Sequence, residues 1–180
     1  MEQIGDRIFF VVGTSEGSGK TLAAKHLSER FGFPLFSSSV VIEPEVERVL
    51  GLAPGTVAAA RALVRSSYRD DLVREGDAMR ARGNPPGVAC VRAGHRIIDG
   101  LRLGTEVVAS VECARSMGLD PMVICLDRHG RPPSDNTDVP GLRAAADAFI
   151  QNDWDAEEPL FAAVDTAIDA HIRKGRRRKR

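Results

Sequence analysis

The sequence predicts an α/β fold in which a five-stranded, mainly parallel sheet lies between layers of helices, as a three-layer αβα sandwich. Two observations support this. Short apolar runs alternate with amphipathic stretches along the chain, which is typical of a parallel sheet with crossover helices. The run "RIFFVVG" at 7–13 is almost continuously apolar, as expected for a central strand buried on both faces.

The first half of the chain predicts two strands and a long helical stretch. The strand at 7–13 leads through a glycine-rich turn into an amphipathic helix at 20–31. "PLFSSS" at 34–39 predicts a short second strand that runs into a polar loop. From there to about residue 83 the signal is helical, with a break at "GLAPG". We interpret 41–94 as a helical insertion between the second and third strands.

The second half predicts three more strands and two helices. The expected strands are "HRIIDG" at 95–100, "PMVICLD" at 121–127 and the weaker "AFIQND" at 148–153. The expected helices are 105–117 and a last helix that starts after Asp155 and ends near Lys174. Proline, glycine and asparagine predict that 128–141 is a loop.

Composition indicates one globular domain at 1–172. The 180 residues are 43% hydrophobic and 28% charged, and they include no apolar run near the ~20 residues that span a bilayer. We therefore expect no membrane association and a cytoplasmic location. Cys90, Cys113 and Cys125 match no metal or disulfide spacing, which suggests buried thiols. The sequence leaves the oligomeric state open, and a homodimer is compatible with it.

The formal net charge of zero hides a strong asymmetry. The last eight residues, "RKGRRRKR", hold seven of the 25 lysines and arginines, so the rest has 18 basic against 25 acidic residues. Such a block predicts a disordered basic tail at 173–180. Its interpretation stays open between a solvated tail without a role in function and an electrostatic contact with nucleic acid.

The stretch "GTSEGSGKT" at 13–21 approaches the phosphate-binding pattern G-x-x-x-x-G-K-[ST]. Thr14 stands where the first glycine belongs, so either Gly13 provides the flexibility or Thr14 adopts a compatible conformation. A strand precedes the stretch and a helix follows, as a phosphate loop requires. The expected nucleotide-binding residues in this stretch are Gly13, Ser15, Glu16, Gly17, Ser18, Gly19, Lys20 and Thr21. Of these, Lys20 would contact the β- and γ-phosphates and Thr21 would bind Mg²⁺.

A second candidate site is "RIIDGLR" at 96–102. Asp99 ends a predicted strand at the edge where ligands bind in open α/β sheets. It would hold Mg²⁺ or accept a proton from an attacking hydroxyl, whereas the alternative is a helix cap. Arg102 would meet a phosphate with its bidentate guanidinium, or would lie at the surface. Lys20, Asp99 and Arg102 are the predicted catalytic residues.

Four further residues are candidates for acceptor binding: Ser38, Arg69, Arg80 and Arg128. Arg69 and Arg80 are 11 residues apart and therefore share a helix face. Arg74 does not share that face. Ser38 follows the second strand, and Arg128 lies in "DRHGR", the nearest candidate for an arginine-bearing lid. Each has the alternative of an ordinary surface position.

Together these segments resemble the small P-loop kinases of the nucleoside monophosphate kinase class, and among them the bacteriophage-type deoxynucleoside monophosphate kinases. The resemblance rests on "GTSEGSGKT", on "RDDLVREGDAMR" at 69–80, on "IIDGLRLGTEVVASVECARSMG" with Asp99, Arg102 and Glu106, and on "AFIQND" with Asn152 and Asp153. These segments cover about 80 residues in the family's order. The segment 41–94 is short beside the phage enzymes.

The resemblance implies ATP- and Mg²⁺-dependent phosphoryl transfer to a nucleotide-like acceptor, with a P-loop NTPase fold and with Asn152 near the adenine. The expected acceptor is a nucleoside or deoxynucleoside monophosphate. Two alternatives remain open. The acceptor could be a hydroxyl of a modified base in DNA, or the protein could bind a nucleotide without transferring phosphate.

Overall fold

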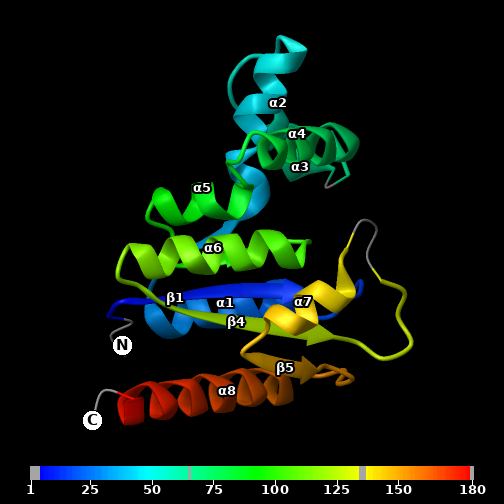
Figure 1. Cartoon of the computed structure of the whole chain (residues 1–180). Coiled ribbons are helices and arrows are strands. Elements are labelled where there is room, and N and C mark those ends of the chain that lie inside the picture. Colours follow the sequence, from blue (N-terminus) through cyan, green and yellow to red (C-terminus); the bar gives the residue numbers. More distant parts are fainter. Residues whose placement is uncertain (1–4, 65, 134–136, 179–180) are drawn as a thin grey trace.

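The computed structural model describes residues 5–64, 66–133 and 137–178 and shows the predicted three-layer α/β architecture (Figure 1). Five parallel strands pair in the order β2-β3-β1-β4-β5. The strands are β1 (Arg7–Gly13), β2 (Leu35–Ser37), β3 (Ile97–Asp99), β4 (Asp120–Asp127) and β5 (Ala148–Gln151). All five expected strands are therefore confirmed, and several are shorter than predicted.

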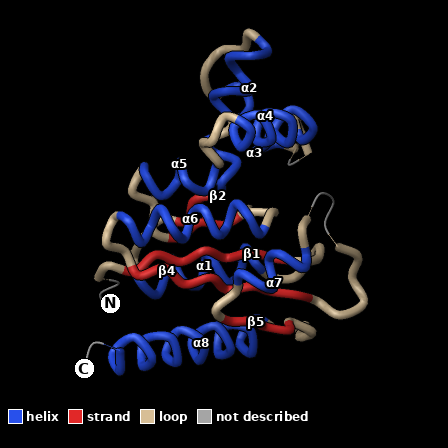
Figure 2. The backbone as a smooth tube through the Cα atoms, viewed as in Figure 1, coloured by secondary structure: helices blue, strands red, loops and turns tan. Residues whose placement is uncertain are grey.

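Eight α-helices and one 3-10 helix accompany the strands in the described part of the chain, and the last helix follows the last strand. They are α1 (Lys20–Phe31), η1 (Ser38–Val41), α2 (Glu43–Leu50), α3 (Thr56–Leu63), α4 (Arg69–Ala81), α5 (Pro86–Arg92), α6 (Gly104–Ser116), α7 (Val139–Ala145) and α8 (Glu157–Arg178). Figure 2 shows the strands between helices on both sides. In the described residues, none of these helices is long and apolar enough to cross a membrane.

Side chains of the central strand alternate between two hydrophobic clusters, as the two-residue period of a strand requires. Phe9 and Val11 pack with α1 and α8 on one face of the sheet. Phe10 and Val12 pack with α5, α6 and α7 on the other face. All four side chains are fully buried, which explains why the run 7–13 lacks polar alternation.

The predicted insertion is smaller than 41–94. Helices α2, α3 and α4 share a separate cluster around Val46, Val57 and Met79 and stand away from the sheet (Figure 1). Helix α5 belongs instead to the layer that covers the sheet, because Cys90 and Val91 pack against β1 and β3. The insertion therefore ends after α4.

Two further expectations are corrected at helix boundaries. The predicted loop 128–141 ends early, because α7 begins at Val139 with Asp138 as its N-cap and a proline in its first turn. Proline is well suited to this position, so here it starts a helix. Helix α8 continues to Arg178, past the predicted start of a disordered tail at 173–180 that follows a domain at 1–172, and residues 179 and 180 lie outside the described residues. Lysine and arginine are good helix formers, and the helix dipole favours them near a C-terminus.

Burial keeps the thiols of Cys90 and Cys125 protonated. Cys90 and Cys125 are buried and free, and Cys113 is half-buried. Desolvation is the main cause that raises the pKa of Cys90 to about 12 and that of Cys125 to about 11. The described residues hold no cluster of His, Cys, Asp and Glu that would bind a metal by itself.

Candidate active site

A cleft of about 1400 Å³ lies at the carboxyl ends of β1, β2 and β3. Its wall on one side is the loop between β1 and α1, and its wall on the other side comes from η1, α3 and α4. Asp99, Arg102 and neighbouring residues line it between these walls. Parallel α/β sheets bind ligands at this edge, so the site lies where the fold predicts one.

The loop between β1 and α1 has the backbone conformation of a phosphate cradle. Gly17 and Gly19 adopt left-handed φ angles of 68° and 86°, which side chains rarely tolerate. At Gly17 a Cβ atom would meet nothing within 4 Å, so the backbone there is open to a ligand. The N-cap of α1 is Gly19, which has no side chain to cap the helix, and the first turn contains no acidic residue. A helix N-terminus of this kind favours an anion.

The residue in the place of the usual first glycine carries no backbone strain. Thr14 is not among the described residues with positive φ, and neither is Gly13. The Thr14 side chain is buried and donates from Oγ1 to Asp127 Oδ1 at 2.6 Å. Gly13 is needed for close packing, because a Cβ there would lie 2.4 Å from Ser18 Oγ. The altered spacing therefore preserves the loop.

Most of the predicted nucleotide-binding residues line the cleft: Gly13, Glu16, Gly17, Ser18, Gly19, Lys20 and Thr21. Two do not. Ser15 is buried and accepts a hydrogen bond from the Arg128 backbone N–H at 3.0 Å. Asn152 lies behind the loop, where its Nδ2 donates to Ser18 O at 3.0 Å. A Cβ on Gly19 would collide with this amide at 2.4 Å, so Asn152 supports the loop.

The turn after β3 places the second group of predicted residues in the cleft. Asp99 is buried at the end of β3, in register with Val11 of β1 and Ser37 of β2. Gly100 follows with a φ of 87°, and a Cβ there would lie 2.9 Å from Ser38 Oγ. Glycine therefore allows the chain to turn tightly along the cleft. Asp99 and Arg102 both line it.

Three of the four candidate acceptor residues, Ser38, Arg69 and Arg80, also line the cleft. Arg80 donates to Glu106 at 3.1 Å and to Asp77 at 2.5 Å. Arg128 instead pairs with Asp155 at 3.0 Å and is not among the cleft-lining residues.

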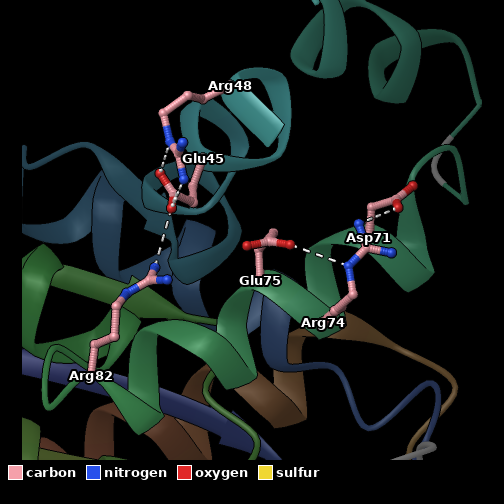
Figure 3. Close-up of polar contacts among 6 residues, drawn as sticks. All are labelled: Glu45, Arg48, Asp71, Arg74, Glu75 and Arg82. Carbon is pink, nitrogen blue, oxygen red and sulfur yellow. Dashed lines mark hydrogen bonds and ion pairs between the residues drawn. The ribbon is translucent and has the colours of Figure 1, made fainter. Parts of the chain in front are cut away.

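Arg48, Arg74 and Arg82 make their contacts outside the cleft. Arg74 pairs with Asp71 at 2.8 Å and with Glu75 at 3.2 Å (Figure 3). Glu45 joins Arg48 of α2 to Arg82 after α4. Its pKa is lowered, chiefly by the hydrogen bond from Arg48. Of these surface pairs, Arg82–Glu45 joins α2 to the end of α4, whereas the others lie within one helix, and each contributes little stability.

Sequence reasoning missed Arg61, which reaches the cleft from α3. It pairs with Glu43 and donates to Ser39 Oγ at 3.0 Å. Ser37 and Ser39 line the cleft beside Ser38, so the whole "SSS" run contributes. The only signal for Arg61 is one charged residue within "AAARAL", which does not distinguish a cleft residue from an exposed one.

A strand, a glycine-bearing loop and a helix, in a parallel sheet of order 2-3-1-4-5, are typical of the P-loop NTPase fold. No protein-family model matches the sequence, and no curated protein matches it significantly. Among solved structures, the chain is similar to a crystal structure described as "a putative kinase" from Chloroflexus aurantiacus J-10-fl. The identity is 11% and the TM-score 0.46, over 92% of this chain and 98% of that one. So weak a likeness does not establish activity.

Proposed function

We propose that the protein is an ATP- and Mg²⁺-dependent phosphotransferase whose acceptor is a nucleoside or deoxynucleoside monophosphate. One observation carries the proposal. A single cleft of about 1400 Å³ joins a phosphate loop to a wall that bears Arg61, Arg69 and Arg80. This volume exceeds the roughly 300–1,000 Å³ of a typical single-ligand site and suits two substrates side by side.

The donor nucleotide fits the residues at the loop wall. The open backbone at Gly17 and the uncapped first turn of α1 offer N–H donors to its phosphates. Lys20 follows the loop and neutralises phosphate charge. Thr21 and Asp99 supply the oxygen ligands that Mg²⁺ prefers, and the ion, when bound, neutralises negative charge on the transferred phosphoryl group.

Positioning and charge neutralisation are then the chain's contribution, because phosphoryl transfer asks little covalent chemistry of the protein. Arg102 stabilises the phosphate between the two walls. Asp99, at the end of β3, orders the metal or the attacking oxygen. Arg69 and Arg80 bind the acceptor's phosphate, as bidentate guanidinium groups do.

A phosphorylation assay with γ-labelled ATP and MgCl₂ tests this function. The acceptors are nucleoside and deoxynucleoside monophosphates, dephospho-coenzyme A, and duplex DNA with a hydroxymethylated base. We expect label on a monophosphate, and a loss of about 10³-fold in kcat for Lys20→Ala. Lys25→Ala, at an exposed position of α1, is the matched control and should retain activity.

The other outcomes separate the alternatives. Label on the DNA base would show that the acceptor is a base in DNA and not a free monophosphate. ATP binding by the wild-type protein without transfer to any acceptor would indicate a nucleotide-binding protein that is not a kinase. No ATP binding at all would overturn the proposal.

A further inference from the structure

The first residues of the phosphate loop are held by the end of the neighbouring strand β4, through the Asp127 side chain and the Leu126 carbonyl. Thr14 is 2% exposed, and its Oγ1 lies 2.6 Å from Asp127 Oδ1 and 3.3 Å from Leu126 O. A hydroxyl has one proton to donate, so the shorter contact with the carboxylate takes it. The Thr14 backbone N–H also donates to Leu126 O at 3.0 Å. Thr14 therefore joins the end of β1 to the end of β4.

Asp127 is ionised and engaged on both oxygens. Its Oδ2 accepts from Arg143 Nη2 at 2.6 Å. Burial acts to raise its pKa, but hydrogen bonds from Thr14, Arg143 and Ser15 outweigh it and hold the pKa below the ordinary value of 3.8. At neutral pH the group is thus a carboxylate that only accepts hydrogen bonds. It connects the loop to α7 through its two oxygens.

Helix α7 extends this connection to the turn that carries Arg102. Its N-cap Asp138 accepts from Gly141 N at 3.0 Å and from Gly104 N, at the start of α6, at 3.2 Å. The Asp138 backbone N–H donates to Arg102 O at 2.9 Å. The backbones of Gly104 and Gly141 approach so closely that a Cβ on Gly104 would lie 2.4 Å from the Gly141 carbonyl carbon. One end of α7 thus contacts the Arg102 turn, and Arg143 near its other end contacts Asp127.

We propose that Asp127 is a positioning residue that holds the phosphate loop through Thr14 and, through Arg143 and α7, fixes its distance to the Arg102 turn. The inference rests on the proposed function, because it takes the loop and Arg102 as parts of one site. In this chain the contact between Thr14 and Asp127 holds the start of the loop, at the position where the usual motif has a flexible glycine. Misplacement by about 1 Å of a group that positions substrate is enough to cost 10²-fold in rate.

Substitutions at Thr14 separate this role from simple packing. Thr14→Val keeps the shape but removes the hydroxyl, and we expect kcat to fall 10- to 100-fold and the Kd for a fluorescent ATP analogue to rise several-fold. Thr14→Ser keeps the hydroxyl and should restore both to within about threefold of wild type. Thr14→Gly restores the usual motif but lacks the hydroxyl, so it should resemble Thr14→Val.

Controls distinguish the outcomes. Thr166→Val removes a hydroxyl that donates within α8, away from the site, and should change neither value. Arg143→Gln removes the cation that contacts Asp127 Oδ2. Because the Arg143 side chain is half-exposed, this variant tests the proposal even where Thr14→Val does not fold. We expect a several-fold lower kcat for Arg143→Gln, and a kcat nearer to wild type for Arg143→Lys, which keeps the positive charge.

The proposal is overturned if folded Thr14→Val binds and reacts as wild type, or if Thr14→Ser is as impaired as Thr14→Val. Lack of ATP binding by the wild type would instead refute the proposed function.

Discussion

The wall formed by the glycine-rich loop and the start of α1, which we assign to the donor and call the donor wall, is built around glycines and a helix N-terminus. The wall formed by η1, α3 and α4, which we assign to the acceptor and call the acceptor wall, bears long charged side chains. At the donor wall, the glycines at 17 and 19 and the first turn of α1 present N–H groups beside residues 8–13 of β1, which are buried. At the acceptor wall, arginines from α3 and α4 reach the cleft while paired with carboxylates such as Glu43 and Glu106. A backbone cradle recognises any polyphosphate, while side chains on an insertion can differ between acceptors. We therefore expect some substitutions at the acceptor wall to change the stability of the protein and others to change its acceptor specificity.

The largest effect on stability is expected at the Arg80–Glu106 pair. The Glu106 side chain is 2% exposed and accepts from Arg80 and from the Gly87 backbone N–H. Arg80→Met leaves this carboxylate without its cation and should lower the free energy of unfolding by about 3 kcal/mol. Arg82→Met breaks only an exposed pair with Glu45 and should cost under about 1 kcal/mol. Urea denaturation of both variants measures the difference.

The pH dependence of the same variant gives a second test. Burial raises the pKa of Glu106 above its ordinary 4.5, and Arg80 opposes this rise. Without Arg80 the folded pKa rises further, so above pH 4.5 the folded state holds a proton that the unfolded state releases. Stability then falls as pH increases through the folded pKa. Arg80→Met should lose less stability near pH 5 than near pH 8, and adding Glu106→Gln should remove that difference. Equal losses at both pH values would contradict this account.

The next largest effect is expected on acceptor binding at Arg69. Arg69 lines the cleft, whereas Arg74 on the same helix pairs with Asp71 and Glu75 outside it. Loss of a charged hydrogen bond to phosphate costs about 1.5–3 kcal/mol, so Arg69→Ala should raise the acceptor KM roughly 10- to 100-fold. The KM for ATP should stay within about twofold. Arg74→Ala is the matched control, and similar acceptor KM values for the two variants would mean that α4 does not select the acceptor.

The contrast between the two walls also explains what sequence could predict. The donor wall follows from one continuous motif in its expected strand–helix context, so its residues were identified together. The acceptor wall combines η1, α3 and α4, which are brought together by packing around Val46 and Val57 and by the hydrogen bond from Arg61 to Ser39. No local pattern marks Arg61 as a cleft residue. Conversely, Arg128 lies in a stretch similar to a lid but pairs with Asp155 instead.

Two other failures have clear physical causes. Proline was interpreted as a loop signal in 128–141, although Pro140 lies in the first turn of α7 and is favourable there. Asp127 ends β4 as Asp99 ends β3, yet only Asp99 was singled out. The missing information was the contact with Thr14, which joins residues 113 positions apart in the chain.

The smallest effect is expected from removing the basic residues at 173–180. Helix α8 runs back along the sheet, and its His171 lies 3.7 Å from Asp120, the first residue of β4 (Figure 1). The cleft is at the other end of the strands, about 20 Å or more away at roughly 3.3 Å per residue. Truncation after residue 172 keeps Leu160, Val164 and Ile168, which pack on the sheet, so the domain should still fold. We expect kcat/KM for a free monophosphate to change less than about twofold, at both 50 mM and 300 mM salt. A salt-dependent loss would show that the basic segment takes part in acceptor capture despite its distance from the cleft.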